Sequence, residues 1–366
     1  MWKEAIRVEL TSLIDKRHVF QIVKQEDIPP EHKRKTYNLM ILLKRKRNKF
    51  REISKYKCRL VMDGSRQEVG KDVFDPFSPV IDYATVRLLI SLAFGNGWKM
   101  FHWDISVAFT NADVHEPTYV RFPKNFPSDI CPGYAGGVLA RLLKNLYGSK
   151  TAPKWWYKCL TDFLVEIGFR SVAGHPCLFM RIHNENGIVC CVIIGIFVDD
   201  LLVTVFPNSA IVRAESELAE RFEHTNQGEL DYYLGVEITL VNEFTLSLHQ
   251  SSYVESVLET FKMQGCKPTS TPLPLNLDLS LKDSPDEVEP VLQAEYRAIV
   301  GSLMYLYQWT RPDLGFAVTF LSRYLHKPGV KHMQAANILS VTCKALRLLE
   351  FVILVTRTAF AVEDTT

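Results

Sequence analysis

The chain has 366 residues, enough for two or three domains, and its 47% hydrophobic and 23% charged content is ordinary for a soluble globular protein. The formal net charge of +2 is too small to mark a nucleic-acid-binding protein by overall charge, so the distribution of charge matters more. The eight cysteines show neither a CxxC pair nor a Cys/His finger spacing. We therefore expect reduced thiols in an intracellular protein, not a disulfide framework.

The N-terminal region predicts a helix and a short strand. Residues 2–16 carry apolar side chains at helical spacing, which favours an amphipathic packing helix over a signal peptide. Residues 19–23 are apolar and β-branched enough to predict a strand. A polar loop follows.

Residues 39–61 predict a β-hairpin with a charged turn. Nine basic residues and one acid lie between Lys44 and Arg59. This run is either an ordinary solvated face or a face that neutralises the phosphates of a nucleic acid or a triphosphate. Alternation along the second strand would place Lys55, Lys57 and Arg59 on one face.

The next stretch predicts a helix and a strand with one acid. Residues 74–94 contain a proline-marked loop and then a helix, capped by Thr85 or by Asp82. Residues 99–109 predict a strand that carries Asp104. A single aspartate at a strand end is usually a helix N-cap, but beside a second acidic turn it is also a candidate metal ligand.

The middle of the chain alternates strands and helices. Residues 119–123 and 138–143 predict a second hairpin, and a helix then runs to Ile167 and ends at Gly168. Trp155 and Trp156 on that helix favour core packing over a stacking platform. The strand expected at 175–183 leads through an Asn-Gly turn into the next hairpin.

Residues 188–206 form the most informative stretch, because two adjacent acids interrupt an apolar, β-branched run. Two buried strands joined by a tight turn would place Asp199 and Asp200 at the tip. Adjacent carboxylates in an apolar setting repel each other and are costly to bury, so a divalent cation is the simplest partner. A solvated turn is the ordinary alternative. The two acids also argue against a membrane span.

The remaining chain predicts a helix, a hairpin, a helix, a linker and two more helices. Their expected ranges are 209–222, 230–240 with 244–250, 252–263, 267–290, 294–310 and 313–326. Residues from about 331 to 366 have a weaker pattern.

Several motifs occur in order along the chain: KYKCRLV, FSPV, TVRLLISLA, WDISVAF, LKNLYGSKTAPKWWY, FVDDLLV, YLGVEI and YRAIVGSLMYLYQWTRPDLGFAV. Together they resemble the reverse transcriptase of copia-type LTR retrotransposons, from about residue 2 to residue 328. The resemblance implies an α/β (α+β) right-hand polymerase fold. It places the fingers at 1–98, the palm at 99–240 with a fingers insertion at about 118–155, the thumb and linker at 241–290, and a truncated connection segment at 291–366.

The resemblance also implies two-metal nucleotidyl transfer with Mg²⁺, or with Mn²⁺ in its place. Asp104 and Asp199 would be the principal metal ligands, and Asp200 the neighbouring acid. Lys57 and Arg59 would bind the triphosphate, and the Phe109 ring would exclude ribonucleotides. The full set of expected nucleotide contacts is Lys57, Arg59, Ile105, Phe109 and Val198, and the primer or template contacts are Phe197, Lys150 and Thr151.

The resemblance implies partners as well: an RNA or DNA template-primer, deoxynucleotides, and RNase H and integrase regions of a longer polyprotein, with no membrane. The expected location is cytoplasmic, in virus-like particles. Phe197, Ser149, Thr151 and Arg51 depart from the family pattern, and the chain looks like a piece of a polyprotein or a decayed copy. An inactive remnant that binds nucleic acid is therefore the main alternative, and a metal-dependent nuclease or phosphatase is a weaker one.

Overall fold

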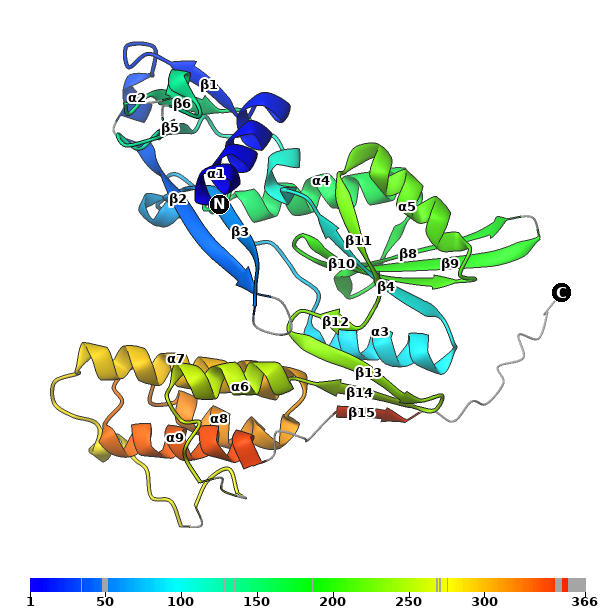
Figure 1. The fold of residues 1–366 in the computed structure, drawn as a ribbon, viewed down its shortest axis with the longest axis vertical. Coiled ribbons are helices and arrows are strands. Elements are labelled where there is room, and N and C mark those ends of the chain that lie inside the picture. Colours follow the sequence, from blue (N-terminus) through cyan, green and yellow to red (C-terminus); the bar gives the residue numbers. More distant parts are fainter. Residues whose placement is uncertain are drawn as a thin grey trace. The chain divides into compact units, whose positions relative to one another are not determined.

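The computed structural model describes residues 1–33, 35–47, 52–127, 129–134, 136–185, 187–267, 269, 271–274, 276–345 and 351–354, with backbone alone at 46, 47, 344 and 345. The chain divides into two compact units (Figure 1). Unit 1 comprises Met1–Ile81 and Trp103–Gln227, and unit 2 comprises Asp82–His102 and the described residues from Gly228 onward. The mixed α/β class is confirmed, whereas the fingers, palm and thumb boundaries stay a prediction.

The first sheet of unit 1 is built around the basic hairpin. Its strand order is β1 (Phe20–Val23), β6 (Leu139–Leu142), β5 (Tyr119–Arg121), β2 (Thr36–Arg47) and β3 (Ile53–Met62). Helix α1 (Trp2–Thr11), extended by a π-helical turn at Ser12–Lys16, packs against β3. Leu10, Leu13 and Leu60 are fully buried in the core between them. The predicted hairpin is confirmed, and Arg51 lies outside the described residues.

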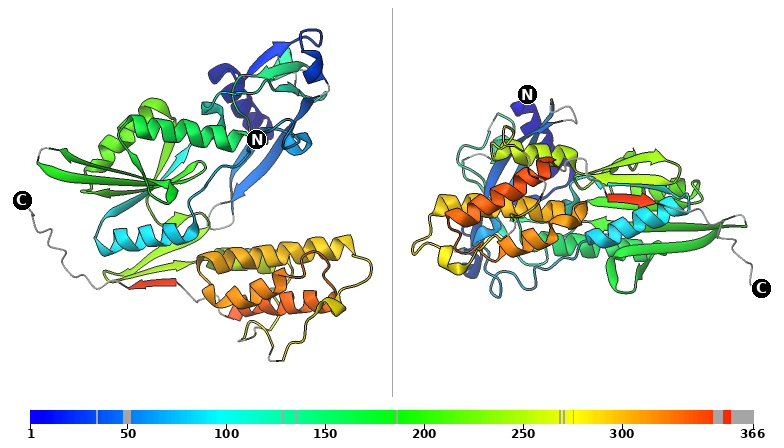
Figure 2. Two further views of the ribbon diagram at one scale, coloured as in Figure 1. Left: turned by 180° about the vertical axis from the view of Figure 1, so that it is seen from behind. Right: turned by 90° about the horizontal axis from the view of Figure 1, so that it is seen from below.

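The second sheet contains the Asp-Asp hairpin. Its order is β11 (His224–Glu229), β4 (Lys99–Ile105), β10 (Asp200–Phe206), β9 (Ile188–Phe197), β8 (His175–Glu185) and β7 (Arg170–Val172). Helices α4 (Ala152–Glu166) and α5 (Ala210–Arg221) cover one face of it (Figure 2). The 188–206 stretch therefore forms sheet strands, and no helix of the described chain is both long and apolar enough to cross a membrane.

Unit 2 joins helix α3 (Tyr83–Gly95) to a small sheet and a helical group. The sheet order is β12 (Tyr232–Tyr233), β13 (Val236–Asn242), β14 (Thr245–His249) and β15 (Phe351–Leu354). The helices are α6 (Ser251–Thr260), α7 (Pro290–Trp309), α8 (Gly315–Ser322) and α9 (Val330–Ala345). They share an apolar core that includes Tyr296, Leu303 and Leu339.

The connections contain short helical segments: α2 (Pro30–Lys33) and 3-10 turns at Gly64–Arg66, Ala108–Asn111, Pro132–Tyr134, Leu281–Asp283 and Pro312–Leu314. One of them corrects the strand expected at 99–109. The strand ends at Ile105, and Val107 takes a left-handed conformation with φ 48° before the chain enters the 3-10 turn. Apolar content alone does not distinguish a strand from a buried 3-10 turn.

The structure also decides the cap of α3. The Asp82 carboxylate accepts hydrogen bonds from the Thr85 N–H at 2.8 Å and from the Thr85 hydroxyl at 2.6 Å. Asp82 is therefore the N-cap, and Thr85 lies inside the first turn.

Candidate active site

A tight turn places two acids at the end of the β9–β10 hairpin. Asp200 pairs with Phe197, so the turn consists of Val198 and Asp199. Val198 has φ 56°, a left-handed conformation that costs a β-branched residue roughly 1–2 kcal/mol. A hydrogen bond from the Trp156 Nε1 to the Val198 carbonyl, 2.7 Å long, holds this geometry. Trp156 comes from α4 and is 1% exposed, so the helix anchors the turn from inside the unit.

The third acid arrives from the neighbouring strand. The Ile105 N–H donates to the Asp199 carbonyl oxygen at 2.8 Å, which brings the end of β4 against the turn. Asp104, the residue before Ile105, is half-buried, as are Asp199 and Asp200. The structure therefore brings together three acids that the sequence separates by almost a hundred residues.

The charges of these acids act on one another. Burial raises the pKa of Asp199, and the charges of Asp200 and then Asp104 raise it further, while Arg59 opposes them. Half-buried like charges of this kind fit a divalent cation with a preference for oxygen ligands. Their carboxylate oxygens do not all lie within 4.8 Å of one another in the described chain. The residues that could hold such an ion are Asp104, Asp199 and Asp200.

One cation of the basic hairpin acts on these acids, since the charge of Arg59 lowers the pKa of Asp199. Lys57 and Arg59 are half-buried on one face of β3. Cys58 and Leu60, which alternate with them along the strand, are buried on the opposite face. The predicted alternation is thus present, although Lys55 lies further out and is exposed.

Tyr147 connects this cationic face to the acids. The Arg59 guanidinium carbon lies 4.5 Å from the centroid of the Tyr147 ring. The centroids of the Phe109 and Tyr147 rings are 4.7 Å apart, in an edge-to-face arrangement. Burial and then the charge of Asp199 raise the pKa of Tyr147 to about 12, so the phenol stays neutral. Arg59, Phe109 and Asp199 therefore act on one half-buried tyrosine that sequence reasoning did not single out.

Two glycines explain how Tyr147 is held. The Met62 N–H donates to the Tyr147 carbonyl at 2.8 Å. Gly148 has φ 92°, and a Cβ there would overlap the Met62 carbonyl oxygen. A Cβ on Gly64 would overlap the Gly148 carbonyl in turn. Only glycine permits this backbone crossing between the end of β3 and the segment that carries Tyr147.

A second residue missed from sequence is Glu9 of α1. Its carboxylate accepts a hydrogen bond from the Leu60 N–H at 3.0 Å. Burial raises the pKa of Glu9, while Lys57 and Arg59 act in the opposite direction. The N-terminal helix therefore supplies the counter-charge beneath the basic face. The helical spacing of 2–16 predicted packing and contained no signal for this role.

The remaining predicted contacts lie at the turn and at the start of α4. Phe197 and Val198 are half-buried at the tip of the hairpin, and the Ile105 side chain is buried. Lys150 turns inward, since its Nζ donates to the Gln67 carbonyl at 2.6 Å. Thr151 is buried and shares a hydrogen bond of 3.1 Å with Ser149. Contacts of these residues with primer, template or nucleotide stay a prediction.

Three half-buried carboxylates at the end of β4 and at the β9–β10 turn could hold divalent cations, and Lys57 and Arg59 of the basic hairpin could bind a phosphate-bearing ligand. A family model described as reverse transcriptase (RNA-dependent DNA polymerase) matches residues 17–274. The chain belongs to the reverse transcriptase family, and the predicted resemblance is confirmed.

The relatives are polyproteins of mobile elements. The chain is 34% identical over 333 residues to the retrovirus-related Pol polyprotein from transposon TNT 1-94 of Nicotiana tabacum, covering 86% of this chain and 24% of that protein. It is 32% identical to the corresponding polyprotein from transposon RE1 of Arabidopsis thaliana, covering 91% and 22%. The chain thus spans about a quarter of the length of these relatives. A solved foamy viral protease-reverse transcriptase in complex with double-stranded DNA aligns with TM-score 0.43 and 14% identity, over 94% of this chain and 48% of that one.

Proposed function

We propose that this chain carries the polymerising site of a retrotransposon reverse transcriptase, which adds deoxynucleotides to the 3′-hydroxyl of a primer on an RNA or DNA template. The observation that carries the proposal is the hydrogen bond from Ile105 to Asp199, because it sets Asp104 beside the Asp-Asp turn. Membership of the reverse transcriptase family supports the same reading.

The acids would hold two Mg²⁺ ions, for which Mn²⁺ could substitute. Such ions supply Lewis-acid activation of the attacking hydroxyl and neutralise the leaving pyrophosphate. Asp104 lies on β4 and Asp199 in the turn between β9 and β10, so they can approach one ion cluster from two sides. Asp200 adds negative charge next to Asp199, as its effect on the pKa of Asp199 indicates.

The basic face would receive the triphosphate. Arg59 donates through a guanidinium whose plane is supported by Tyr147, and its Nε has no hydrogen-bond partner among the described residues. Lys57 lies two positions away on the same face of β3. Charge-assisted hydrogen bonds from such groups are roughly twice as strong as neutral ones. Phe109, packed against Tyr147, would stand beside the sugar and disfavour a 2′-hydroxyl sterically.

Nucleic-acid contacts follow from the ends of the same elements. Phe197 and Val198 at the turn would meet the primer end and the incoming nucleotide, and Lys150 and Thr151 would lie near the template. RNase H and integrase regions of the polyprotein are the proposed protein partners, and cytoplasmic particles the proposed location.

Primer extension by the purified chain with Mg²⁺ tests the proposal, with Asp199→Asn as the critical variant. The matched control is Asp162→Asn, which alters an exposed aspartate of α4 paired with Lys158. We expect extension by the wild type and by the control, and its loss in Asp199→Asn. Equal extension by all three proteins would remove Asp199 from the mechanism. Salt-sensitive template binding without extension, in Mg²⁺ and in Mn²⁺, would instead establish a binding remnant.

A further inference from the structure

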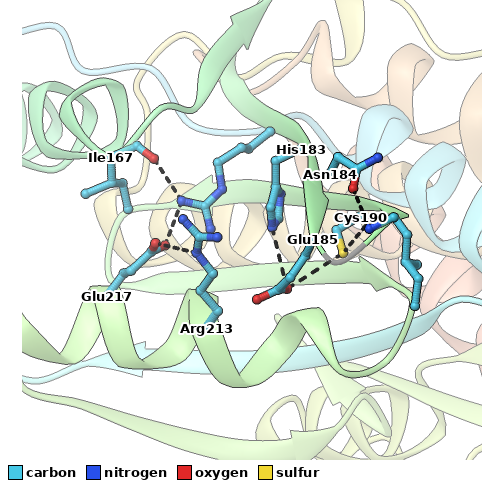
Figure 3. A network of polar contacts seen from close by, with 10 residues as sticks. Ile167, His183, Asn184, Glu185, Cys190, Arg213 and Glu217 are labelled. Carbon is cyan, nitrogen blue, oxygen red and sulfur yellow. Dashed lines mark hydrogen bonds and ion pairs between the residues drawn. The ribbon is translucent and has the colours of Figure 1, made fainter.

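A second cluster of metal-binding side chains lies at the far end of the β8–β9 hairpin. His183 pairs directly with Cys190 across the two strands, and Glu185 follows His183 by two positions. Directly opposed residues and residues two apart share a face of the sheet, so all three side chains point the same way. Figure 3 shows them turned toward one another.

The donor atoms are already close. The Glu185 carboxylate oxygen Oε2 lies 3.9 Å from the His183 Nε2 and 3.9 Å from the Cys190 Sγ, and all donor atoms of the cluster lie within 4.8 Å of one another. Ligands of a tetrahedral zinc ion at bond lengths of 2.0–2.3 Å are separated by roughly 3.6 Å. Shifts of a few tenths of an ångström to about 1 Å would therefore bring three ligands onto one ion.

The ring nitrogens of His183 lack hydrogen-bond partners among the described residues. Its side chain is only 17% exposed, and neither ring nitrogen has a hydrogen-bond partner in the described chain. Leaving a buried nitrogen without a partner costs free energy, so an unpaired imidazole calls for a ligand. Cys190 is 2% exposed and lies on the same side.

The neighbouring charges permit a cation. Glu217 of α5 lies 2.9 Å from the Arg213 Nε (Figure 3) and 2.6 Å from the Arg181 Nη1, so one carboxylate bridges two guanidinium groups and leaves one positive charge uncompensated. A thiolate at Cys190 and the Glu185 carboxylate would supply two further negative charges.

We propose that His183, Glu185 and Cys190 form a zinc-binding site with a water molecule as the fourth ligand. Zn²⁺ in proteins is bound tetrahedrally by histidine nitrogen, carboxylate oxygen and cysteine sulfur, which are the three donor types present here. The site is separate from the carboxylates at the turn, because Cys190 and Phe197 are seven residues apart on β9, or about 23 Å. Bound zinc would tie the two strands together beyond their backbone ladder.

The test is a titration of the metal-free full chain with Co²⁺ and then Zn²⁺, followed by absorbance and calorimetry. A thiolate bound to Co²⁺ produces a charge-transfer band that oxygen ligands alone do not, so the turn acids cannot imitate the signal. The variants are His183→Gln and Cys190→Ser. The matched control is Cys191→Ser, the adjacent cysteine on the opposite face of the same strand.

We expect one Zn²⁺ per chain at this site, a higher melting temperature with zinc, and the cobalt–thiolate band in the wild type and in Cys191→Ser. Both ligand variants should lose the band. Their Zn²⁺ affinity should fall by at least the roughly 10–100-fold that is typical when a residue next to a metal ligand is changed. Circular dichroism checks that each variant is folded. No band in the wild type, or a band that survives in folded Cys190→Ser, would overturn the site. Asp199→Asn should keep the band, so this result is independent of the polymerase proposal.

Discussion

The hydrogen bond that joins Trp156 of α4 to the Asp-Asp turn predicts the effect of Trp156→Phe. The substitution keeps an aromatic ring in a fully buried place but removes the Nε1 that donates to the Val198 carbonyl at 2.7 Å. The left-handed Val198 then loses the contact that offsets its backbone strain.

The magnitude follows from a comparison of two tryptophans. Trp103 is 0% exposed, and its Nε1 has no hydrogen-bond partner within the described ranges. Trp103→Phe therefore creates a similar cavity without breaking a hydrogen bond. An acceptor left unpaired costs about 1–3 kcal/mol. We expect Trp156→Phe to lower the free energy of unfolding by that much more than Trp103→Phe does.

Urea unfolding followed by far-ultraviolet circular dichroism measures both variants without relying on tryptophan fluorescence. Primer extension provides the second readout for Trp156→Phe, since a displacement near 1 Å at the turn can lower the rate by about 100-fold. Equal losses of unfolding free energy for the two variants would show that the indole N–H does not hold the turn.

Three further predictions concern the backbone crossing, the cap of α3 and the buried arginine. Gly148→Ala should cost more than about 2 kcal/mol of unfolding free energy, because positive φ alone costs about 1–2 kcal/mol and the Cβ also meets the Met62 carbonyl. Asp82→Ala should cost about 1 kcal/mol by removing the cap on Thr85, measured by urea unfolding at pH 7. Arg181→Met should cost about 3 kcal/mol in thermal or urea unfolding, because the side chain is 7% exposed and ion-paired.

Two of these have a matched comparison. Gly174 has φ 79° with nothing within 4 Å of its Cβ position, so Gly174→Ala reports the strain alone, and an equal cost at both glycines would exclude the clash. Arg213 also pairs with Glu217 but is 49% exposed, so Arg213→Met should cost less than about 1 kcal/mol. Equal costs for the two arginine variants would show that burial does not set the contribution of the pair.

The cap of α3 also predicts a pH dependence. Burial raises the pKa of Asp82, but hydrogen bonds from Thr85 outweigh it, so the folded-state pKa lies below the usual value. The contribution is therefore complete above the unfolded pKa of about 3.9 and is lost as pH falls through the lower folded value. The gap in stability between wild type and Asp82→Ala should shrink below about pH 4. A gap that stays constant down to pH 2 would contradict an ionised cap.

The sequence was informative wherever structure is local. The alternation in 53–62, the helical spacing in 2–16 and the apolar arms on either side of Asp199 predicted elements that the structure contains. It was weak in the last stretch, where α9 and β15 form. The buried residues of α9 include Ala335, Ala336 and Leu339, which do not form a clean stripe because the helix packs against more than one neighbour.

What the sequence determined by itself is many of the strands and helices, the acids at a hairpin tip and the membership of a family, because these depend on neighbours within a few residues and on ordered motifs. Only the tertiary structure decided that Asp104 meets Asp199, that Tyr147 lies beneath Arg59 and that Trp156 holds the turn. Those contacts join segments far apart in the chain. They depend on which sheet edges and helix faces pack together, and residue spacing carries no record of that packing.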